Sequence, residues 1–95
     1  MSERPTPELL IRNARLVDGT GAPARMADVR TAAGRIAEIA PARTLSPGRG
    51  ERLDADGRLL TPGFVDPHTH YDGQVTWDPI LAPSSWHGVT TVIMG

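Results

Sequence analysis

The stretch Pro62-Gly63-Phe64-Val65-Asp66-Pro67-His68-Thr69-His70 says most about the fold and chemistry of this 95-residue chain. A Pro-Gly turn signal precedes a short apolar run, Phe64-Val65, which leads into two histidines separated by one residue. Residues i and i+2 of an extended strand point to the same face, so His68 and His70 are predicted to aim their imidazoles into one space. Neutral imidazole is a common ligand of zinc and its first-row neighbours. The stretch therefore predicts a strand that carries two metal ligands.

Two carboxylates flank the histidine pair. Asp66 and Asp72 are expected either to orient a metal ligand or to contact substrate. The competing interpretation is structural: Asp66 caps the strand end by accepting backbone N–H groups, and Asp72 forms a turn. No residue of the chain can be assigned as the catalytic acid or base. Gly63, after Pro62, is expected to permit a close backbone approach or a positive φ angle.

A second β-branched run, residues 88–94 (GVTTVIM), is typical of a strand buried on both faces. A strand, a ligand pair, a connection and a second buried strand is the order in which a parallel α/β barrel begins. His87 would then lie at the non-catalytic end of the second strand, where a structural role is favoured. Trp77 and Trp86 either line a pocket for an acyl chain or, as is more common, pack against neighbouring elements.

The residues before Pro62 have a different character. After a polar lead-in at residues 1–8, expected to be flexible, short apolar runs alternate with turn signals. These runs predict strands at residues 9–17, 25–31, 36–39, 51–55 and 59–61. Asp56-Gly57 between the last two indicates a hairpin. We expect residues 9–61 to form a small β-sandwich-like domain of antiparallel strands, and residues 62–95 to begin the barrel domain.

Composition narrows the functional classes. A formal net charge of −1 favours neither nucleic acid nor an anionic membrane as a partner. The chain has no cysteine, which excludes disulfides and thiolate ligands within it, and all ten basic residues are arginine, which excludes a carboxylated lysine. No apolar run resembles a signal peptide or a membrane span, so a cytoplasmic location is expected. An apolar strand at the end of the sequence predicts that these residues are the N-terminal piece of a longer protein.

From about Leu9 to Gly95 the chain resembles the N-terminal part of the amidohydrolase superfamily. Five stretches carry the resemblance in order and spacing: residues 11–14 (IRNA), 17–19 (VDG), 34–39 (GRIAEI), 54–58 (DADGR) and 61–66 (TPGFVD), followed by His-Thr-His. Residues 68–78 (HTHYDGQVTWD) and 85–95 (SWHGVTTVIMG) are similar to the N-acyl-D-amino-acid deacylase, or D-aminoacylase, branch.

The resemblance implies a composite β-domain and a TIM-type (β/α)8 barrel, of which this chain holds the first strands. It implies zinc as the cofactor, His68 and His70 as metal ligands, and hydrolysis of small N-acylated D-amino acids. In that branch an Asn-Cys-Gly usually follows the second strand and supplies a further ligand, and this sequence ends before that position. Because three protein ligands is the usual count for catalytic zinc, the isolated chain is expected to be inactive.

Two alternatives stay open. One is a cyclic amidase of the hydantoinase or dihydroorotase type, which would share the His-x-His pair but need a bridging carboxylated lysine further along the chain. The other is a non-catalytic small β-protein that binds a metal or a partner. The residues that follow Gly95 would decide among the three.

Overall fold

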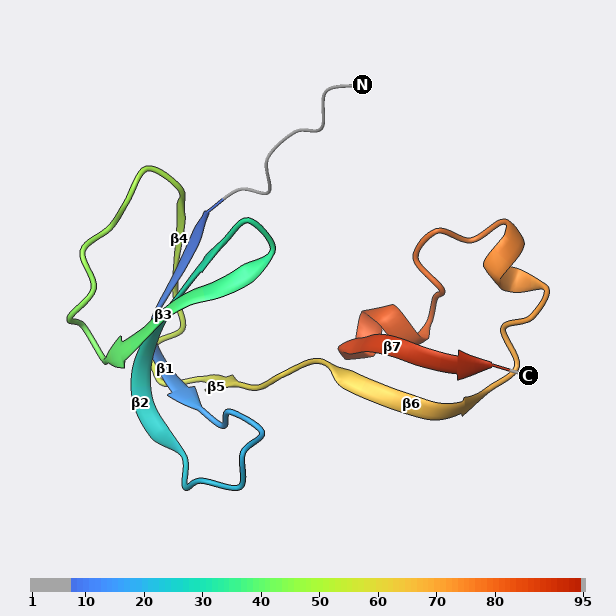
Figure 1. Cartoon of the computed structure of the whole chain (residues 1–95), viewed down its shortest axis with the longest axis horizontal. Coiled ribbons are helices and arrows are strands. Elements are labelled where there is room, and N and C mark those ends of the chain that lie inside the picture. Colours follow the sequence, from blue (N-terminus) through green and yellow to red (C-terminus); the bar gives the residue numbers. More distant parts are fainter. Residues whose placement is uncertain (1–7, 95) are drawn as a thin grey trace. The chain divides into compact units, whose positions relative to one another are not determined.

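The computed structural model describes residues 8–94, so nearly all of the predicted lead-in at residues 1–8 lies outside the described residues. The chain divides into two compact units between Thr61 and Pro62 (Figure 1). The first unit is a β-sheet, and the second combines two parallel strands with two short 3-10 helices. No α-helix occurs within residues 8–94, and neither 3-10 helix there is long and apolar enough to cross a membrane.

Five strands form one mixed sheet in the first unit (Figure 1). They are β1 (Leu9–Leu16), β2 (Arg25–Ala32), β3 (Arg35–Pro41), β4 (Glu51–Asp54) and β5 (Leu59–Leu60). Strands β1, β2 and β3 pair as an antiparallel meander, as their short apolar runs and tight turns predicted. The sequence predicted a sandwich-like domain, but the described strands form a single layer, because all five belong to the same sheet.

The predicted hairpin between β4 and β5 is wrong. Both strands pair with β1, and both run parallel to it, β4 along Leu9–Arg12 and β5 along Arg15-Leu16. The Asp56-Gly57 turn is present, with φ angles of 50° and 80°. The turn carries the chain briefly away from β1, opposite a bulge in that strand. At the bulge Asn13 has a φ of 54°, and its carbonyl accepts a 2.9 Å hydrogen bond from the Gly57 N–H. The chain therefore leaves the edge of β1 and returns to the same edge.

The apolar core of the first unit is small and lies between β1 and β2. Leu16, Ala27 and Val29 form one cluster, against which Leu60 packs. Ala14 pairs with Ala27 on the same face, whereas the buried Leu10 pairs with Arg30 and lies on the other face. Larger apolar side chains at the sheet margins stay exposed, among them Ile36 at 65% and Leu59 at 67%. A one-layer sheet leaves such positions without a covering partner.

Asp28 is fully buried between Ala27 and Val29, on the opposite face of β2. Its carboxylate accepts four backbone N–H groups: those of Asn13 (2.8 Å), Arg43 (2.9 Å), Thr44 (3.0 Å) and Leu45 (3.1 Å). Burial alone would raise the pKa of this carboxyl, but the four donors outweigh it and hold the pKa below its ordinary value. Asp28 thus fastens the bulge of β1 and the connection after β3 to β2.

The second unit contains the predicted parallel strand pair, β6 (Phe64–Thr69) and β7 (Val89–Met94). The connection between them holds η1 (Gln74–Thr76) and η2 (Ser84–His87). A Cβ atom at Gly63 would overlap the Thr90 side chain on β7, so the expected close approach at this glycine is confirmed. Gly88 ends η2 with a φ of 83°, and its carbonyl accepts a 2.9 Å hydrogen bond from Phe64 at the start of β6.

Strand β7 is less buried than its sequence predicted. Val89 and Val92 are half-buried, whereas Ile93 is 55% exposed and the remaining side chains are also exposed. Within residues 8–94, β6 is the one strand that pairs with β7, so one edge and most of both faces have no neighbour. The apolar sequence marks a strand that needs more contacts than these residues supply.

Candidate metal centre

The two histidines of the His-x-His pair lie against each other at the carboxyl end of β6. Their Nε2 atoms are 3.2 Å apart, and their rings meet edge to face with centroids 5.0 Å apart. Thr69 between them points to the other face, where it is buried and its hydroxyl donates a 2.9 Å hydrogen bond to the Ile93 carbonyl of β7. This anchored alternation places His68 and His70 on one face, and both stay exposed.

Two imidazole nitrogens this close can share a proton or a metal ion. In the first case a neutral ring donates Nε2–H to the bare Nε2 of the other. In the second, zinc–nitrogen bonds of about 2.0–2.1 Å and tetrahedral angles place two ligand nitrogens about 3.3 Å apart. The observed 3.2 Å fits a shared ion. No group of three or more His, Cys, Asp or Glu side chains suited to a metal occurs within residues 8–94, so this pair is an incomplete ligand set.

The flanking carboxylates are placed differently from the histidines. Asp66 is half-buried, and its Oδ1 accepts a 3.1 Å hydrogen bond from the backbone N–H of His68. This is the structural role considered for Asp66, and it also restrains the backbone of one histidine. Asp72 is exposed in the turn after Tyr71, and no hydrogen bond joins it to either histidine in the described part of the chain.

The connection after β6 is ordered by polar side chains that the sequence did not single out. The Gln74 amide donates to the Asp78 carboxylate at 2.8 Å and to the Ala82 carbonyl at 2.7 Å. Asp78 also accepts the backbone N–H groups of Ile80 and Ala82. The Gln74 amide, followed by these backbone donors, lowers the pKa of Asp78 below its ordinary value. The four-residue spacing of Gln74 and Asp78 was the available signal for this link.

A second link joins the beginning and the end of the connection. The Tyr71 hydroxyl lies 2.7 Å from the Ser84 hydroxyl, and it also accepts a longer hydrogen bond, 3.4 Å, from the Ser84 backbone N–H. Tyr71 follows His70 directly, and Ser84 is the first residue of η2. The hydrogen bonds therefore tie the segment beside the histidine pair to the element that leads into β7.

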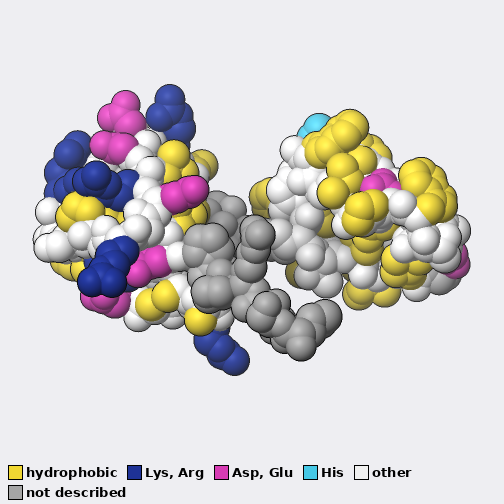
Figure 2. Space-filling view, turned by 90° about the horizontal axis from the view of Figure 1, so that it is seen from above, with side chains coloured by type: hydrophobic (Ala, Val, Ile, Leu, Met, Phe, Trp, Pro, Cys, Tyr) yellow, Lys and Arg dark blue, Asp and Glu magenta, His cyan; other side chains and the backbone are white. Residues whose placement is uncertain are grey.

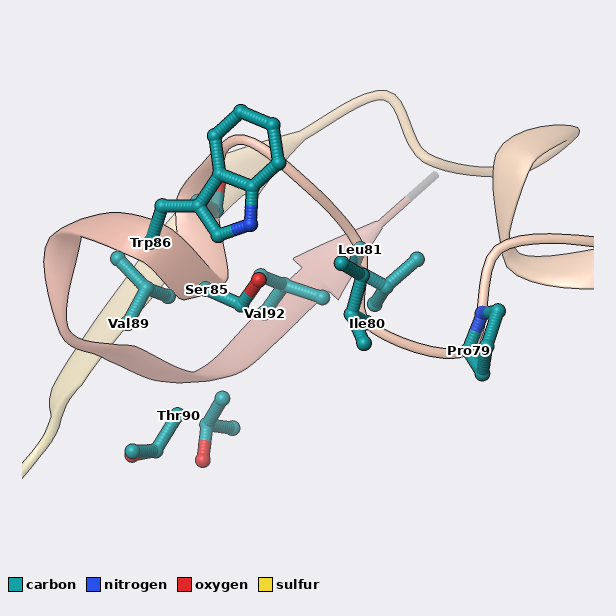
Figure 3. A pocket seen from close by; sticks show the side chains of 10 residues that line it. Pro79, Ile80, Leu81, Ser85, Trp86, Val89, Thr90 and Val92 are labelled. Atoms are coloured by element: carbon teal, nitrogen blue, oxygen red, sulfur yellow. The ribbon is translucent and has the colours of Figure 1, made fainter.

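An apolar pocket of about 510 Å³ lies beside the first residues of β7 (Figure 3). Its walls are residues 79–81, 84–86 and 89–92, with the Trp86 ring on one side. Phe64 pairs with Val89 and Thr69 with Met94, so the pocket lies along the amino-terminal part of β7, whereas the histidines lie at the carboxyl end of β6. The pocket is therefore separate from the histidine pair.

The two tryptophans of the connection are largely exposed in the described chain. Trp77 and Trp86 are each 72% exposed, and of the two only Trp86 lines the pocket. His87 is the last residue of η2 and is separated from β7 by Gly88, at the end of the strand pair opposite to His68 and His70. This is where the order of the sequence elements placed it.

Comparison with known proteins relates the chain to amide hydrolases. Residues 51–95 match the amidohydrolase family. An N-acyl-D-aspartate deacylase from Alcaligenes xylosoxydans xylosoxydans is 40% identical over 88 residues, covering 93% of this chain and 17% of that enzyme. A D-aminoacylase crystal structure superposes with a TM-score of 0.83 at 36% identity, over 95% of this chain and 19% of the other. An N-acyl-D-glutamate deacylase from Bordetella bronchiseptica, solved with zinc and a phosphonate mimic of the tetrahedral intermediate, gives 0.81 at 38%, over 94% and 18%.

Cyclic amidases match a smaller part of the structure. The L-hydantoinase (dihydropyrimidinase) from Arthrobacter aurescens superposes with a TM-score of 0.57 at 28% identity, over 68% of this chain and 14% of the hydantoinase. The deacylase structures therefore follow both units of the chain, whereas the hydantoinase follows about two thirds of it. The chain spans less than a fifth of the length of each of these relatives.

Proposed function

We propose that the whole protein is a zinc-dependent hydrolase of the amidohydrolase family, whose model matches residues 51–95, and that it removes the acyl group from N-acyl-D-amino acids. The observation that carries the proposal is the pair of Nε2 atoms, 3.2 Å apart, at the carboxyl end of a strand in a parallel pair. Superposition on the two deacylase structures with TM-scores of 0.81 and 0.83, against 0.57 for the hydantoinase, supports the choice of a linear amide substrate.

Strands β6 and β7 are proposed to be the first two strands of a (β/α)8 barrel, with the sheet of residues 9–60 as part of a second, composite domain. Active sites of such barrels lie at the carboxyl ends of the strands, which is where His68 and His70 stand. Their Nε2 atoms would hold the metal, and Asp66 and the Thr69–Ile93 hydrogen bond would keep the two rings on one face. When bound, zinc supplies the Lewis acidity that amide hydrolysis needs at neutral pH.

The proposal assigns the remaining ligands and the general base to residues beyond those described. Two histidines are one ligand short of the usual three in catalytic zinc sites. Asp72 stays a candidate for substrate contact, because it lies in the first loop after a barrel strand and is exposed. A cyclic amidase is the second candidate, and the weaker superposition of the hydantoinase places it behind the deacylase.

Substrate assays on the full-length protein test the proposal. Purified protein would be assayed with N-acetyl-D-amino acids, their L enantiomers and a 5-substituted hydantoin, before and after removal of metal by a chelator. We expect turnover of the D-amides, loss of turnover with the chelator and recovery with zinc. Hydrolysis of the hydantoin in preference to the amides would favour the cyclic amidase, and activity that resists the chelator would contradict a zinc enzyme.

A further inference from the structure

We propose that Tyr71 and Ser84 form a clasp that positions His70 for metal binding. We use clasp for the hydrogen-bonded contact between the Tyr71 hydroxyl and Ser84. The inference rests on the proposed function, because it assumes that His70 is a metal ligand. It concerns how this ligand is held, which neither the strand pairing nor the histidine pair explains.

His70 lies just outside the strand ladder. The last residue of β6 is Thr69, which pairs with Met94, so the backbone hydrogen bonds of the sheet end one residue before this histidine. His68, in contrast, lies within β6, and its backbone N–H is held by Asp66. Without other restraints on the backbone of His70, its ring could sample many positions. Ordering the ring on metal binding would then cost conformational entropy.

The neighbours of His70 supply the missing restraint. On one side, the Thr69 hydroxyl bonds the Ile93 carbonyl. On the other, Tyr71 is held twice: its carbonyl accepts a 2.8 Å hydrogen bond from the Val75 N–H, and its half-buried side chain reaches Ser84. His70 is thus bracketed by two anchored residues, and both anchors lead to the β7 side of the unit.

The far end of the clasp is itself fixed. Ser84 opens η2, and the backbone N–H of Gly88 bonds the carbonyls of Ser84 and Ser85 at the end of this helix. The Gly88 carbonyl in turn accepts the N–H of Phe64, the first residue of β6. The clasp therefore closes a circuit that runs from the carboxyl end of β6 through η2 to the amino end of the same strand. Removing it should loosen His70 while the strand pair itself is kept.

The expected effect falls on metal affinity. Loss of a group that orients a metal ligand typically weakens metal binding by about 10- to 100-fold. We expect Tyr71→Phe and Ser84→Ala each to weaken zinc binding about tenfold, at the lower end of that range, because the clasp acts on His70 through the backbone. The double variant should bind zinc no more weakly than Tyr71→Phe alone, because Ser84→Ala removes one of the two hydrogen bonds that Tyr71→Phe removes together. Ser84→Thr keeps a hydroxyl and should retain most of the affinity.

Zinc binding to metal-free full-length protein, measured by competition with a chromophoric chelator, tests the clasp. Thr76→Val is the matched control, because Thr76 also donates a side-chain hydrogen bond in the connection, at 2.7 Å to Gly73, without joining its two ends. Thermal unfolding of the metal-free forms separates affinity from folding. The inference predicts tenfold weaker zinc for Tyr71→Phe and Ser84→Ala, recovery in Ser84→Thr and no change in Thr76→Val.

Two kinds of result would overturn the inference, and they are distinguishable. If the wild type binds zinc and hydrolyses N-acyl-D-amino acids while Tyr71→Phe and Ser84→Ala bind zinc as tightly, the clasp has no positioning role and the proposed function stands. Equal weakening by Thr76→Val, or additive losses in the double variant, would have the same meaning. If the wild type binds no zinc, the proposed function falls and the clasp falls with it. Should Tyr71→Phe fail to fold, the comparison of Ser84→Ala with Ser84→Thr still decides.

Discussion

The two units of the chain use their polar residues in different ways. All ten arginines and eight of the eleven acidic residues precede Pro62, leaving three aspartates, three histidines and no basic residue other than histidine in residues 62–95. Figure 2 shows charged side chains over the first unit and broad hydrophobic areas over the second. Two charged side chains of the first unit hydrogen-bond to several groups within that unit. Asp28 accepts four backbone N–H groups, and Arg30 donates to Glu8, Glu38 and the Ser46 carbonyl.

The second unit leaves its most reactive side chains free for a ligand. Every buried apolar residue of the described chain lies on β1 or β2, and Thr69 is the one buried residue of the second unit. Its polar network holds the connection and the strand ends, while His68 and His70 face one another and solvent. The first unit thus has polar side chains that bond its own backbone, whereas the second leaves two neighbouring imidazoles exposed, as the proposed metal site requires.

The largest expected effect is the loss of zinc and activity when a proposed metal ligand is removed, with the fold of the first unit unchanged. His68→Ala and His70→Ala in the full-length protein should each remove most of the bound zinc and the amidase activity. The loss should exceed the about 10- to 100-fold cost of losing an orienting group, because a ligand itself is removed. Metal analysis beside circular dichroism would check this, with His87→Ala as the control that keeps both. Full zinc content and turnover in both variants would remove the ligand assignment.

The next largest effect is a loss of stability in the first unit when Asp28 is replaced, a change that does not touch the histidine pair. Asp28→Ala should lower the free energy of unfolding by about 3 kcal/mol, because it leaves four partly buried backbone N–H groups without their acceptor. Asp28→Asn should cost less, since one amide oxygen still accepts hydrogen bonds. Urea unfolding at pH 7 measures both. A loss below 0.5 kcal/mol for Asp28→Ala, the size of an ordinary surface substitution, would show that the four bonds matter little.

The same carboxylate gives the first unit a pH dependence of known sign. The pKa of Asp28 is depressed in the folded state, so its stabilising contribution is present above the unfolded pKa, about 3.9, and is lost as the pH falls through the lower folded value. Wild-type stability should therefore fall more steeply below about pH 4 than that of Asp28→Asn. Parallel slopes for the two proteins in acid unfolding titrations would contradict the assignment.

A smaller loss of stability is expected when the close contact between β6 and β7 of the second unit is disturbed. Gly63→Ala should destabilise by about 1–3 kcal/mol, because the new Cβ overlaps Thr90 on β7 and forces the two strands apart. Gly73→Ala is the matched control: its φ is −82° and its Cβ position is open. Thermal unfolding of the full-length protein compares the two. Equal melting temperatures would mean that β6 and β7 do not approach as closely as the structure has them.

The sequence predicted what depends on local spacing. Short apolar runs bounded by turn signals located β1, β2 and β3, and the two-residue period of a strand placed His68 and His70 on a common face. The sequence could not assign the partners of β4 and β5, because an Asp-Gly pair marks a turn without showing whether the chain reverses there. The pairing depends on the bulge at Asn13, which has a positive φ angle and whose carbonyl accepts a hydrogen bond from the Gly57 N–H.

Contacts between distant residues were beyond the reach of pattern analysis. Asp28 bonds backbone groups 15 to 17 residues away, and Tyr71 meets Ser84 at a separation of 13. Neither pair has a periodic spacing that would single it out. Both depend on the folded path of a connecting segment, and both involve a side chain that could equally have faced solvent.

Anomalous diffraction at the zinc edge from crystals of the active full-length protein tests the central claim most directly. The account predicts a peak bonded to the Nε2 atoms of both His68 and His70, about 2.0–2.1 Å from each, with further ligands from outside the residues described. An active enzyme whose zinc peak lies elsewhere, with the two imidazoles hydrogen-bonded to each other, would contradict it.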